Sequence, residues 1–525
     1  MTGTMLEVPE KFNITGLLVD SHIGQGRGLE AAVFYRDKYL TYEDVYHEVN
    51  KTGNMLKSLG VRREQRVLIL LPDCPEFIYT FLGAIKIGAV PVPLNTMLNA
   101  KDYAYYLYDS RAVALVVAAE LLPQVKGVLP QATELKEVIV VGEGRSVYRN
   151  YAELVSAASP ELMPAETSRD DACYWLYSSG STGMPKGTIH LHHDMVFAVN
   201  FLDQAVTNIR PGDRIFSVSK MFFSYGNNNS IFMPFLSGVP VILLPERPEP
   251  RRIREIVEKH RPTVYFGVPS SYSAILRSAE EGLRFDFSSV RLFISAGENL
   301  PKTLLEKWQQ RFGAEILDGI GSTEAGHIFI CNRPGEIRPG SSGRALPGYE
   351  FRIVDENDHE VPVGAVGELK LKSDGVAAGY WNKHHKTKKT FVGEWLYTGD
   401  QFSIDGDGYF WYSGRSDDMI KVGGIWVSPI EVEDALLGYP CVKECAVVGA
   451  MDRDGLIKLA AHVVLNNGYD PGEQMTRELR DFVKTTAGAF KAPRWVNYVT
   501  ELPRTASGKI QRFKLRESSA KMQIS

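Results

Sequence analysis

The stretch Tyr177-Ser-Ser-Gly-Ser-Thr-Gly-Met-Pro-Lys-Gly187 combines three glycines and four small hydroxyl side chains with one lysine. It follows Cys173–Tyr177, an apolar and aromatic run that predicts a buried strand. Glycines let backbone N–H groups approach phosphate oxygens closely, Ser and Thr donate hydrogen bonds, and Lys186 adds a positive charge. The stretch therefore predicts a polyphosphate-binding loop that follows a strand, and not merely a flexible Gly/Ser turn.

Two other motifs with similar residues are excluded. A Walker A loop needs a lysine followed by Ser or Thr, whereas here Lys186 is followed by Gly187. A nucleophile elbow needs a glycine two residues before and two residues after its serine, and Ser181 has only the second. The loop therefore favours neither a P-loop kinase nor a serine hydrolase.

Outward from this loop, short apolar runs alternate with helix-length amphipathic stretches such as Arg251–His260 and Lys302–Phe312. This rhythm predicts an α/β fold: mostly parallel sheets covered by helices, which bind ligands at the carboxyl ends of their strands. The runs that predict buried strands are Val67–Leu71, Ala114–Ala118, Glu137–Val141, Val239–Leu244, Thr263–Val268 and Val290–Ser295.

The pattern changes after about Pro347, where shorter strands (Tyr349–Asp355, Glu368–Leu371 and Tyr409–Tyr412) predict a small β-barrel-like part. A smaller α+β unit follows, with strands at Glu444–Gly449 and Leu459–Leu465 and a helix near Gln474–Thr485. We therefore expect an N-terminal domain over residues 1–416 and a C-terminal domain over residues 417–525.

Composition sets limits on the function. The chain has 525 residues, 44% of them hydrophobic, and a net charge of -4, which argues against a nucleic-acid-binding surface. The most apolar region, Val67–Leu94, contains charged residues, so we expect no membrane span. The N-terminal residues 1–13 have no basic patch followed by an apolar run, so we expect no secretory signal. Five scattered cysteines predict a reducing cytoplasm, with Cys441 and Cys445 as packing groups and not zinc ligands. The oligomeric state stays open, a homodimer included.

Ser178–Gly187 resembles the signature of the AMP-forming adenylating superfamily, which includes acyl-CoA synthetases and adenylation domains. Further motifs in the same order extend the resemblance over nearly the whole chain. It implies that the loop holds the phosphates that leave as pyrophosphate. The loop residues assigned to nucleotide binding are Ser178, Ser179, Gly180, Ser181, Thr182, Gly183 and Lys186.

Asp318-Gly-Ile-Gly-Ser-Thr-Glu324 is similar to the superfamily's second nucleotide motif. Thr323 can donate to the α-phosphate, and Glu324 can hold Mg²⁺, which prefers carboxylate ligands. Asp400, in Tyr397-Thr-Gly-Asp400, and Arg415 resemble the pair that contacts the ribose. The other residues expected at the nucleotide are Gly297, Glu298, Asp318, Gly319, Ile320 and Ser322.

The C-terminal motifs imply a two-step reaction with ATP, Mg²⁺ and coenzyme A. Lys509 matches the catalytic lysine that orients carboxylate and ATP, where negative charge develops on the α-phosphorus. Asp417 matches the hinge about which the small domain swings between an adenylate-forming and a thioester-forming position. Lys421, Gly423 and Gly424 would belong to the coenzyme A side.

Residues Lys220–Asn229 occupy the segment that selects the acid in this superfamily, and their aromatic density suits a flat ring. The chain most resembles the benzoate–CoA ligases, which carry Phe-Phe-Ala-Tyr-Gly-Leu-Gly-Asn here. Ser224 and Asn227 depart from that pattern, and Ala325-Gly326 departs from the corresponding segment of these ligases further along the chain. Together the departures imply a pocket that is roomier or more polar. We therefore expect a hydroxy- or aminobenzoate as the substrate. The expected pocket residues are Ser224, Tyr225, Gly226, Ala296, Gly297, Gly321, His327 and Ile328.

Three histidines, His190, His192 and His193, could suggest a metal site, but no second cluster completes one, so we expect packing or capping. Three alternatives for the function stay open: loading of an aryl group onto a carrier protein, ligation of a medium-chain or alicyclic acid, and a non-catalytic nucleotide sensor. A sensor should have lost Lys509 or Glu324, and both are present.

Overall fold

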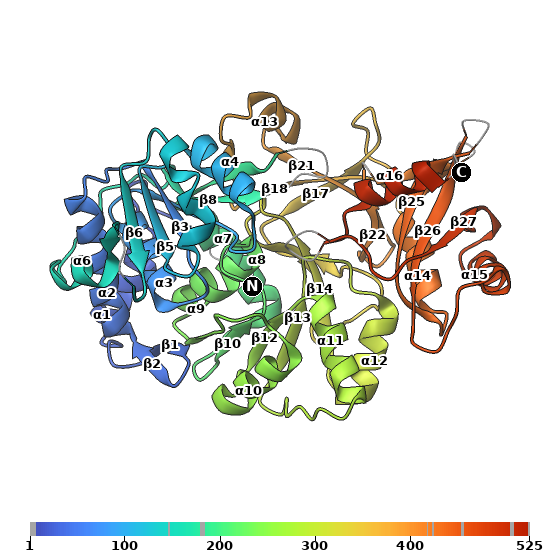
Figure 1. The fold of residues 1–525 in the computed structure, drawn as a ribbon, viewed down its shortest axis with the longest axis horizontal. Helices are drawn as coiled ribbons and strands as arrows, with labels where there is room; N and C mark the ends of the chain where they lie inside the picture. Colours follow the sequence, from blue (N-terminus) through green and yellow to red (C-terminus); the bar gives the residue numbers. More distant parts are fainter. Residues whose placement is uncertain are drawn as a thin grey trace.

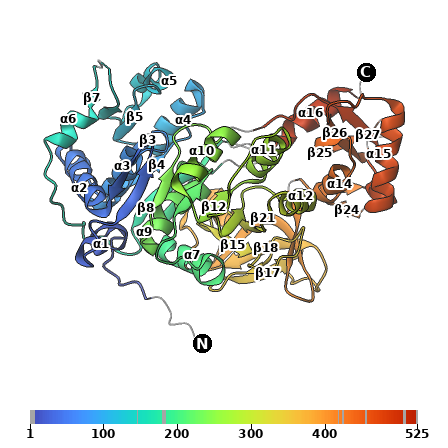
Figure 2. The ribbon, with the colours of Figure 1, turned by 90° about the horizontal axis from the view of Figure 1, so that it is seen from below.

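The structure is a computed structural model that describes residues 7–144, 147–178, 184–416, 418–422, 425–452, 456–504 and 509–522. Two parallel-centred sheets and an antiparallel sheet form the larger part of the molecule, and a smaller unit lies beside them (Figures 1 and 2). The α/β class expected from the alternating apolar runs is confirmed.

The first sheet is parallel throughout, with the order β4-β3-β5-β6-β7. Helices α2 (Tyr42–Ser58) and α3 (Pro75–Lys86) pack against one face, on the side of Val67 and Ile69. Helices α4 (Ala100–Ser110) and α5 (Leu122–Lys126) cover the other face. The strands are β3 (Arg66–Leu70), β4 (Val90–Pro93), β5 (Ala114–Ala118), β6 (Glu137–Val141) and β7 (Arg149–Asn150).

The apolar segment Val67–Leu94 therefore forms two strands with the buried helix α3 between them. Across the described residues, no helix combines the length and the apolar character that a membrane span requires.

The second sheet has nine strands in the order β16-β15-β14-β13-β12-β10-β11-β1-β2. Its six central strands are parallel, and the outer strands pair antiparallel. Helices α10 (Pro250–His260), α11 (Pro269–Glu280) and α12 (Lys302–Phe312) pack on it around the fully buried Trp308. The strands are β1 (Ala31–Tyr35), β2 (Lys38–Thr41), β10 (Ile215–Ser217), β11 (Val241–Leu243), β12 (Val264–Gly267), β13 (Leu292–Ser295), β14 (Ile316–Gly321), β15 (Ile328–Cys331) and β16 (Arg344–Ala345).

Strands β8 (Ala172–Ser178) and β9 (Lys186–Leu191) form an antiparallel pair, so the two ends of the glycine-rich loop lie on neighbouring strands. Strand β19 (Gly379–Tyr380) pairs with the outer edge of β9. Helix α7 (Asp194–Leu202) begins directly after this unit. The predicted β-barrel-like part is an antiparallel sheet of β17 (Glu350–Val354), β18 (Gly367–Lys372), β20 (Phe391–Val392), β21 (Trp395–Ile404) and β22 (Phe410–Arg415).

The C-terminal unit has its own apolar clusters around β25 and β26. In its three-stranded sheet, β25 pairs antiparallel with β26, and β26 pairs parallel with β27. The predicted boundary residue, Asp417, lies outside the described residues, so the division at 416/417 stays a prediction. The elements are β23 (Ile420–Val422), β24 (Ile425–Val427), α14 (Pro429–Leu437), β25 (Val442–Met451), β26 (Ile457–Leu465), α15 (Glu473–Thr486), β27 (Trp495–Tyr498) and α16 (Arg512–Met522).

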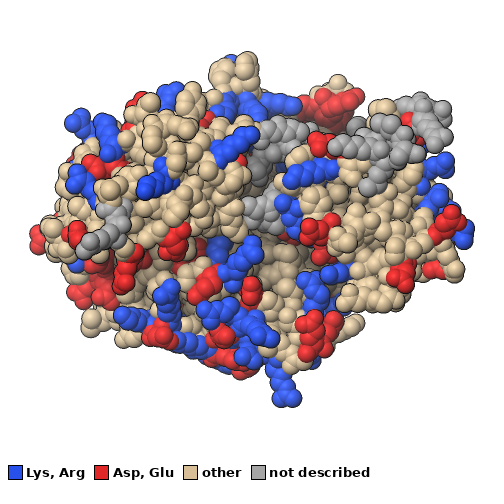
Figure 3. Space-filling model, in the orientation of Figure 1, with Lys and Arg blue, Asp and Glu red and all other residues tan. Residues whose placement is uncertain are grey.

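On the face shown in Figure 3, Lys and Arg side chains alternate with Asp and Glu side chains and form no continuous basic field. This mixture agrees with the small net charge of -4.

Candidate active site

The centre of the site is a turn at the end of β14, where the chain reverses direction into β15. The Ser322 hydroxyl accepts a hydrogen bond from the Ala325 N–H at 3.1 Å. The Ala377 N–H donates to the Glu324 carbonyl at 2.9 Å. These bonds fix the backbone at Thr323 and Glu324, the residues predicted to contact the α-phosphate and Mg²⁺.

The Glu324 carboxylate is the acceptor for a cluster that joins the first nucleotide motif to the second. Its Oε1 accepts from the Tyr380 hydroxyl at 2.7 Å and from the Ser178 hydroxyl at 3.2 Å. The Lys186 ammonium lies 3.6 Å from the same oxygen and donates to the Tyr380 hydroxyl at 3.1 Å. Residues of β8, β9, β14 and β19 are thereby brought to one point.

The charges in this cluster favour an ionised carboxylate. Burial raises the pKa of Glu324, but Lys186, the Tyr380 hydroxyl and Arg415 outweigh burial, so that the pKa lies below its usual value. Burial lowers the pKa of the Lys186 ammonium, and the carboxylate offsets part of that effect. A carboxylate that stays ionised in a buried site is a suitable ligand for Mg²⁺, so the residues present fit this ion.

Tyr380 was not among the residues singled out from the sequence. Its hydroxyl bridges Lys186 and Glu324, and its ring lies 4.2 Å below the Lys186 ammonium. Gly379 and Tyr380 lie on a two-residue strand, which is too short for a periodic signal. Only the pairing of β19 with β9 places Tyr380 at the site.

The predicted ribose pair lies on two adjacent strands, β21 and β22, where Asp400 and Arg415 are direct partners. Arg415 Nη1 donates to Asp400 Oδ1 at 2.9 Å, and burial raises the pKa of Asp400 while Arg415 and Lys509 offset that rise. Gly399 adopts φ of +71°, and a Cβ there would approach the Arg415 guanidinium to 2.9 Å. Glycine therefore leaves room for the arginine to lie against the backbone.

The exposed Lys509 reaches this region from the C-terminal unit. Burial raises the pKa of Glu298, and the positive charges of Arg504 and Lys509 offset part of that rise. Lys509 also offsets part of the rise that burial causes in the pKa of Asp400. The structure thus places the predicted catalytic lysine close enough to act electrostatically on Glu298 and Asp400, two residues of the larger part.

The predicted acid pocket lies beside the same turn. The Ser224 hydroxyl donates to the Gly326 carbonyl at 2.9 Å, and Asn228 Nδ2 donates to the same oxygen at 2.6 Å. Asn227 donates from Nδ2 to the Met221 carbonyl at 3.0 Å. These polar side chains therefore bond to the protein backbone, Ser224 and Asn228 at Gly326 and Asn227 at Met221.

His327 contributes a defined donor to the predicted pocket. Its Nδ1 accepts from the Ile328 N–H at 2.8 Å, and burial lowers the pKa of His327 to about 3, so the neutral ring carries its proton on Nε2. Among the described residues, Nε2 has no hydrogen-bond partner. The ring of Tyr225 lies edge-on, with 6.4 Å between the ring centroids.

Two glycines of the pocket are required by close contacts. A Cβ on Gly226 would meet the Lys220 carbonyl at 2.1 Å, and one on Gly321 would meet the His327 carbonyl at 2.5 Å. Ala296 is buried at the end of β13, next to Gly297, whose φ is +90°. The acid-selecting segment also contains Phe222 and Phe223. Phe222 is buried, as a core residue is.

Several predicted residues lie outside the described part of the chain: Ser179, Gly180, Ser181, Thr182, Gly183, Asp417, Gly423, Gly424 and the side chain of Lys421. The three histidines are all described. His192 accepts from the Ile14 N–H at 3.3 Å, and His193 lies 2.9 Å from the Arg169 carbonyl, as packing or capping groups do. His190 instead contacts the turn of the active site, with its Nε2 2.7 Å from the Thr323 carbonyl.

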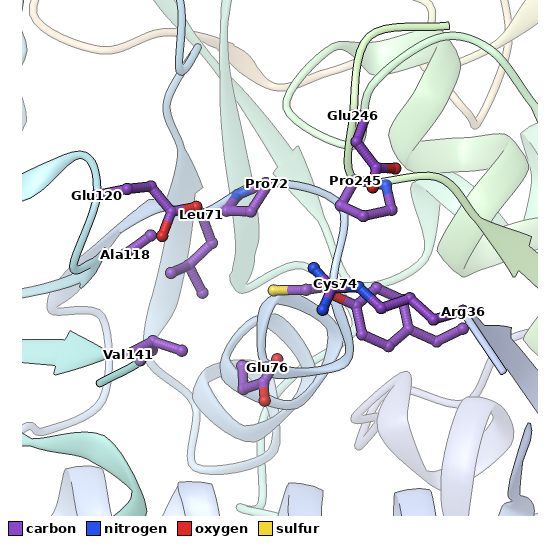
Figure 4. Close-up of a pocket in the computed structure, with 12 residues that line it drawn as sticks. Arg36, Leu71, Pro72, Cys74, Glu76, Ala118, Glu120, Val141, Pro245 and Glu246 are labelled. Atoms are coloured by element: carbon purple, nitrogen blue, oxygen red, sulfur yellow. The ribbon is translucent and has the colours of Figure 1, made fainter. Parts of the chain in front are cut away.

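A separate cavity of about 440 Å³ lies at the carboxyl ends of β3, β5 and β6 (Figure 4). Its lining contains Arg36, Cys74 and the carboxylates of Glu76, Glu120 and Glu246. None of the described residues predicted for nucleotide or acid binding lines it. The catalytic motifs therefore converge elsewhere, at the turn after β14.

Comparison with known proteins gives the context for this geometry. The family of AMP-binding enzymes matches residues 21–381, and the AMP-binding enzyme C-terminal domain matches residues 431–509. The chain is 42% identical to a benzoate–CoA ligase of Thauera aromatica, over 98% of each chain. It is 40% identical to a 4-hydroxybenzoate–CoA/benzoate–CoA ligase of Rhodopseudomonas palustris, over 96% of this chain and 94% of the relative.

Solved structures show the same similarity. The anthranilate CoA ligase AuaEII in complex with anthranoyl-AMP superposes with a TM-score of 0.93 at 39% identity, over 99% of both chains. A benzoate CoA ligase from Burkholderia xenovorans LB400 superposes with a TM-score of 0.89 at 39% identity, over 96% of this chain and all of the other. The resemblance inferred from the motifs is confirmed.

Proposed function

The chain belongs to the family of AMP-binding enzymes, and from this premise we propose that it ligates an aromatic carboxylic acid to coenzyme A at the expense of ATP. The observation that carries the proposal is the convergence of Lys186, Glu324, Asp400 and Lys509, and the predicted acid-binding residues Tyr225 and His327 also lie together. Similar proteins support an aromatic acid, since their names specify benzoate, hydroxybenzoate or anthranilate.

In the first step, a carboxylate oxygen attacks the α-phosphorus of ATP, the α–β phosphoanhydride bond breaks, and pyrophosphate leaves. Lys186 and Thr323 would bind phosphate oxygens, Asp400 would accept from the ribose hydroxyls, and Arg415 would contact the ribose. Lys509 would stand where negative charge develops on the α-phosphorus. Glu324 would hold Mg²⁺, which when bound neutralises phosphate charge.

In the second step, the thiolate of coenzyme A attacks the acyl carbon and AMP leaves. The first step occurs at the α-phosphorus and the second at the acyl carbon, but both use one site and need different partners beside the same carboxyl group, so a movement of the C-terminal unit is a physical solution. We assign Asp417 as the hinge and Lys421, Gly423 and Gly424 to the coenzyme A side, as the sequence motifs imply. Next to the hinge, Arg516 Nη1 donates to Asp418 at 3.0 Å and would let α16 move together with the segment after residue 417.

For the acid, we infer a benzoate that carries a hydroxyl or amino group. The support is the polar wall: Ser224 and Asn228 both bond to Gly326, and His327 offers an N–H donor. An aromatic acid without a substituent would leave that donor unpaired, which is costly for a buried group. A cytoplasmic location and a homodimer belong to the same proposal, and light scattering of the purified protein tests the second.

The experiment is AMP formation with ATP and Mg²⁺ across benzoate, its hydroxy and amino derivatives, phenylacetate, cyclohexanecarboxylate, hexanoate and palmitate. Coenzyme A and a phosphopantetheinylated carrier protein serve as alternative acceptors in parallel reactions. An aromatic acid with strict coenzyme A dependence supports the proposal. Preference for hexanoate or cyclohexanecarboxylate would replace the aromatic assignment, and faster transfer to the carrier would replace the acceptor.

A further inference from the structure

We propose that His190, oriented by Asp194, is a positioning residue that fixes the Thr323–Glu324 turn for adenylation. The inference rests on the proposed function, because it concerns the same nucleotide site. His190 lies on β9, four residues after Lys186. Because side chains alternate along a strand, Lys186 and His190 share one face. Lys186 approaches the Glu324 carboxylate at one end of this face, and His190 approaches the Thr323 backbone at the other.

The contacts of the imidazole define what it does. Nε2 lies 2.7 Å from the Thr323 carbonyl oxygen, and Nδ1 lies 2.8 Å from Asp194 Oδ2. Both side chains are completely buried, and the ring stacks on Tyr174 with 4.9 Å between centroids and 15° between planes. A carbonyl oxygen can only accept, so Nε2 must carry a proton and donate to it.

The Asp194 carboxylate oxygen can also only accept, so Nδ1 carries a proton toward it and the ring donates from both nitrogens. Asp194 Oδ2 also accepts from the Leu191 N–H at 3.1 Å, so the carboxylate is held in place by the backbone while it faces Nδ1. Asp194 is also the first residue of α7, where the helix dipole favours a negative charge. A carboxylate at Nδ1 is a common way to fix the orientation of a histidine whose other nitrogen acts elsewhere.

The position of Thr323 matters because the turn carries both residues assigned to the phosphates and their Mg²⁺, Thr323 and Glu324. The Gly326 N–H reaches the Thr323 carbonyl at 3.2 Å, which makes His190 Nε2 the closer donor to this oxygen. If the imidazole is lost, the buried carbonyl loses its shorter bond, and the turn that carries Glu324 can shift. A shift of about 1 Å at a reacting centre can cost on the order of 100-fold in rate.

Three variants test the assignment. His190→Leu removes the donor, and His190→Gln can restore an N–H to Thr323. In Asp194→Asn, the side-chain oxygen must still accept from the Leu191 N–H and from Nδ1, but the negative charge is lost, so the ring keeps one proton on Nδ1 and turns the Nε2 lone pair toward Thr323. His192→Gln is the matched control, since it removes a neighbouring buried histidine that does not contact the turn.

We expect His190→Leu and Asp194→Asn to lower ATP–pyrophosphate exchange by about 10–100-fold, with His190→Gln in between. Thioester formation from a supplied acyl-adenylate should change by less than about threefold, since pyrophosphate and the Mg²⁺ bound to it have already left at that step. His192→Gln should lower the melting temperature without this difference between the half-reactions. Equal losses in both half-reactions, or normal exchange in folded His190→Leu, would overturn the inference.

A second measurement does not depend on activity. In protein labelled with ¹⁵N-histidine, the signal that His190→Leu removes should show protons on both ring nitrogens, and Asp194→Asn should leave a proton on Nδ1 alone. A wild-type His190 that is unprotonated at Nε2 would contradict the assignment even if the variants fold poorly. If the wild type shows no exchange with any acid, the proposed function fails, whereas the protonation of Nε2 is still measured independently.

Discussion

The Lys186 ammonium lies 3.6 Å from the Glu324 carboxylate, and the Tyr380 hydroxyl bridges the two groups. The lysine follows the glycine-rich loop and the glutamate follows β14, so the contact joins the two nucleotide motifs. Both side chains are only 15% exposed, so each charge lies largely out of water. The pair therefore favours the ionised form of each group.

The first prediction concerns the bridge. Tyr380→Phe removes the hydroxyl but keeps the ring, which packs at 5.3 Å against Phe391. Because hydrogen bonds to charged groups contribute about 1.5–3 kcal/mol, adenylation should fall roughly 10–100-fold with little change in melting temperature. ATP–pyrophosphate exchange measures the effect. Tyr409→Phe, which removes a hydroxyl bonded to the Glu336 carbonyl, is the control, and equal losses in both variants would argue against a specific bridge.

The second prediction concerns the charge of Lys509. Acetylation, or Lys509→Gln, removes a cation that acts on Asp400 and Glu298. Adenylation should fall by about 100–1,000-fold, while thioester formation from a supplied acyl-adenylate should persist. Each half-reaction is assayed by its own product, pyrophosphate for adenylation and acyl-CoA for thioester formation. Lys514→Gln on α16 should leave both unchanged, and full activity after stoichiometric acetylation of Lys509 would exclude this site as a switch.

The third prediction concerns selection of the acid. Ser224→Ala removes one of the two donors to the Gly326 carbonyl and makes the wall less polar. Because such a bond contributes about 0.5–1.5 kcal/mol, the ratio of kcat/KM for benzoate to that for a hydroxybenzoate should rise roughly 2–10-fold. Ser217→Ala, in β10, serves as the control. A ratio that stays constant would show that Ser224 does not affect selection.

The fourth prediction concerns pH and the C-terminal unit. Burial, with the charges of Glu433 and Glu431, raises the pKa of Asp434 to about 7, and Asp318 of the larger part also faces it. Between the ordinary aspartate value and pH 7, the folded state binds more protons than the unfolded state. The free energy of unfolding should therefore decrease as the pH rises through this window.

Asp434→Asn should remove this dependence and stabilise the protein above pH 7. The titration of one group changes the free energy of unfolding by at most about 1.4 kcal/mol per pH unit. This is the largest slope that Asp434→Asn can remove. Urea unfolding of wild type and variant at several pH values between 5 and 8 measures it. The control is Asp481→Asn, because Lys484 lowers the pKa of this exposed carboxyl group and so its titration lies below the window. If the wild type and Asp434→Asn show parallel slopes, Asp434 does not cause the dependence.

Much of the fold could be predicted from local patterns. Ala114–Ala118, Glu137–Val141 and Lys302–Phe312 coincide with β5, β6 and α12. These segments are either continuous apolar runs, which form strands buried on both faces, or strongly amphipathic stretches with one buried face. In both cases the residues that decide the structure are neighbours in sequence, so the pattern is readable without the fold.

The sequence by itself also determined the chemistry, since the glycine-rich loop, Asp318–Glu324, Asp400 and Lys509 each carry their function in their residue type and order. Only the tertiary structure decided which side chains complete the site. Tyr380 reaches Glu324 because β19 pairs with β9, and His190 reaches Thr323 because β9 lies beside the turn after β14. These contacts depend on the pairing and packing of segments that lie far apart in sequence, and local periodicity contains no information about them.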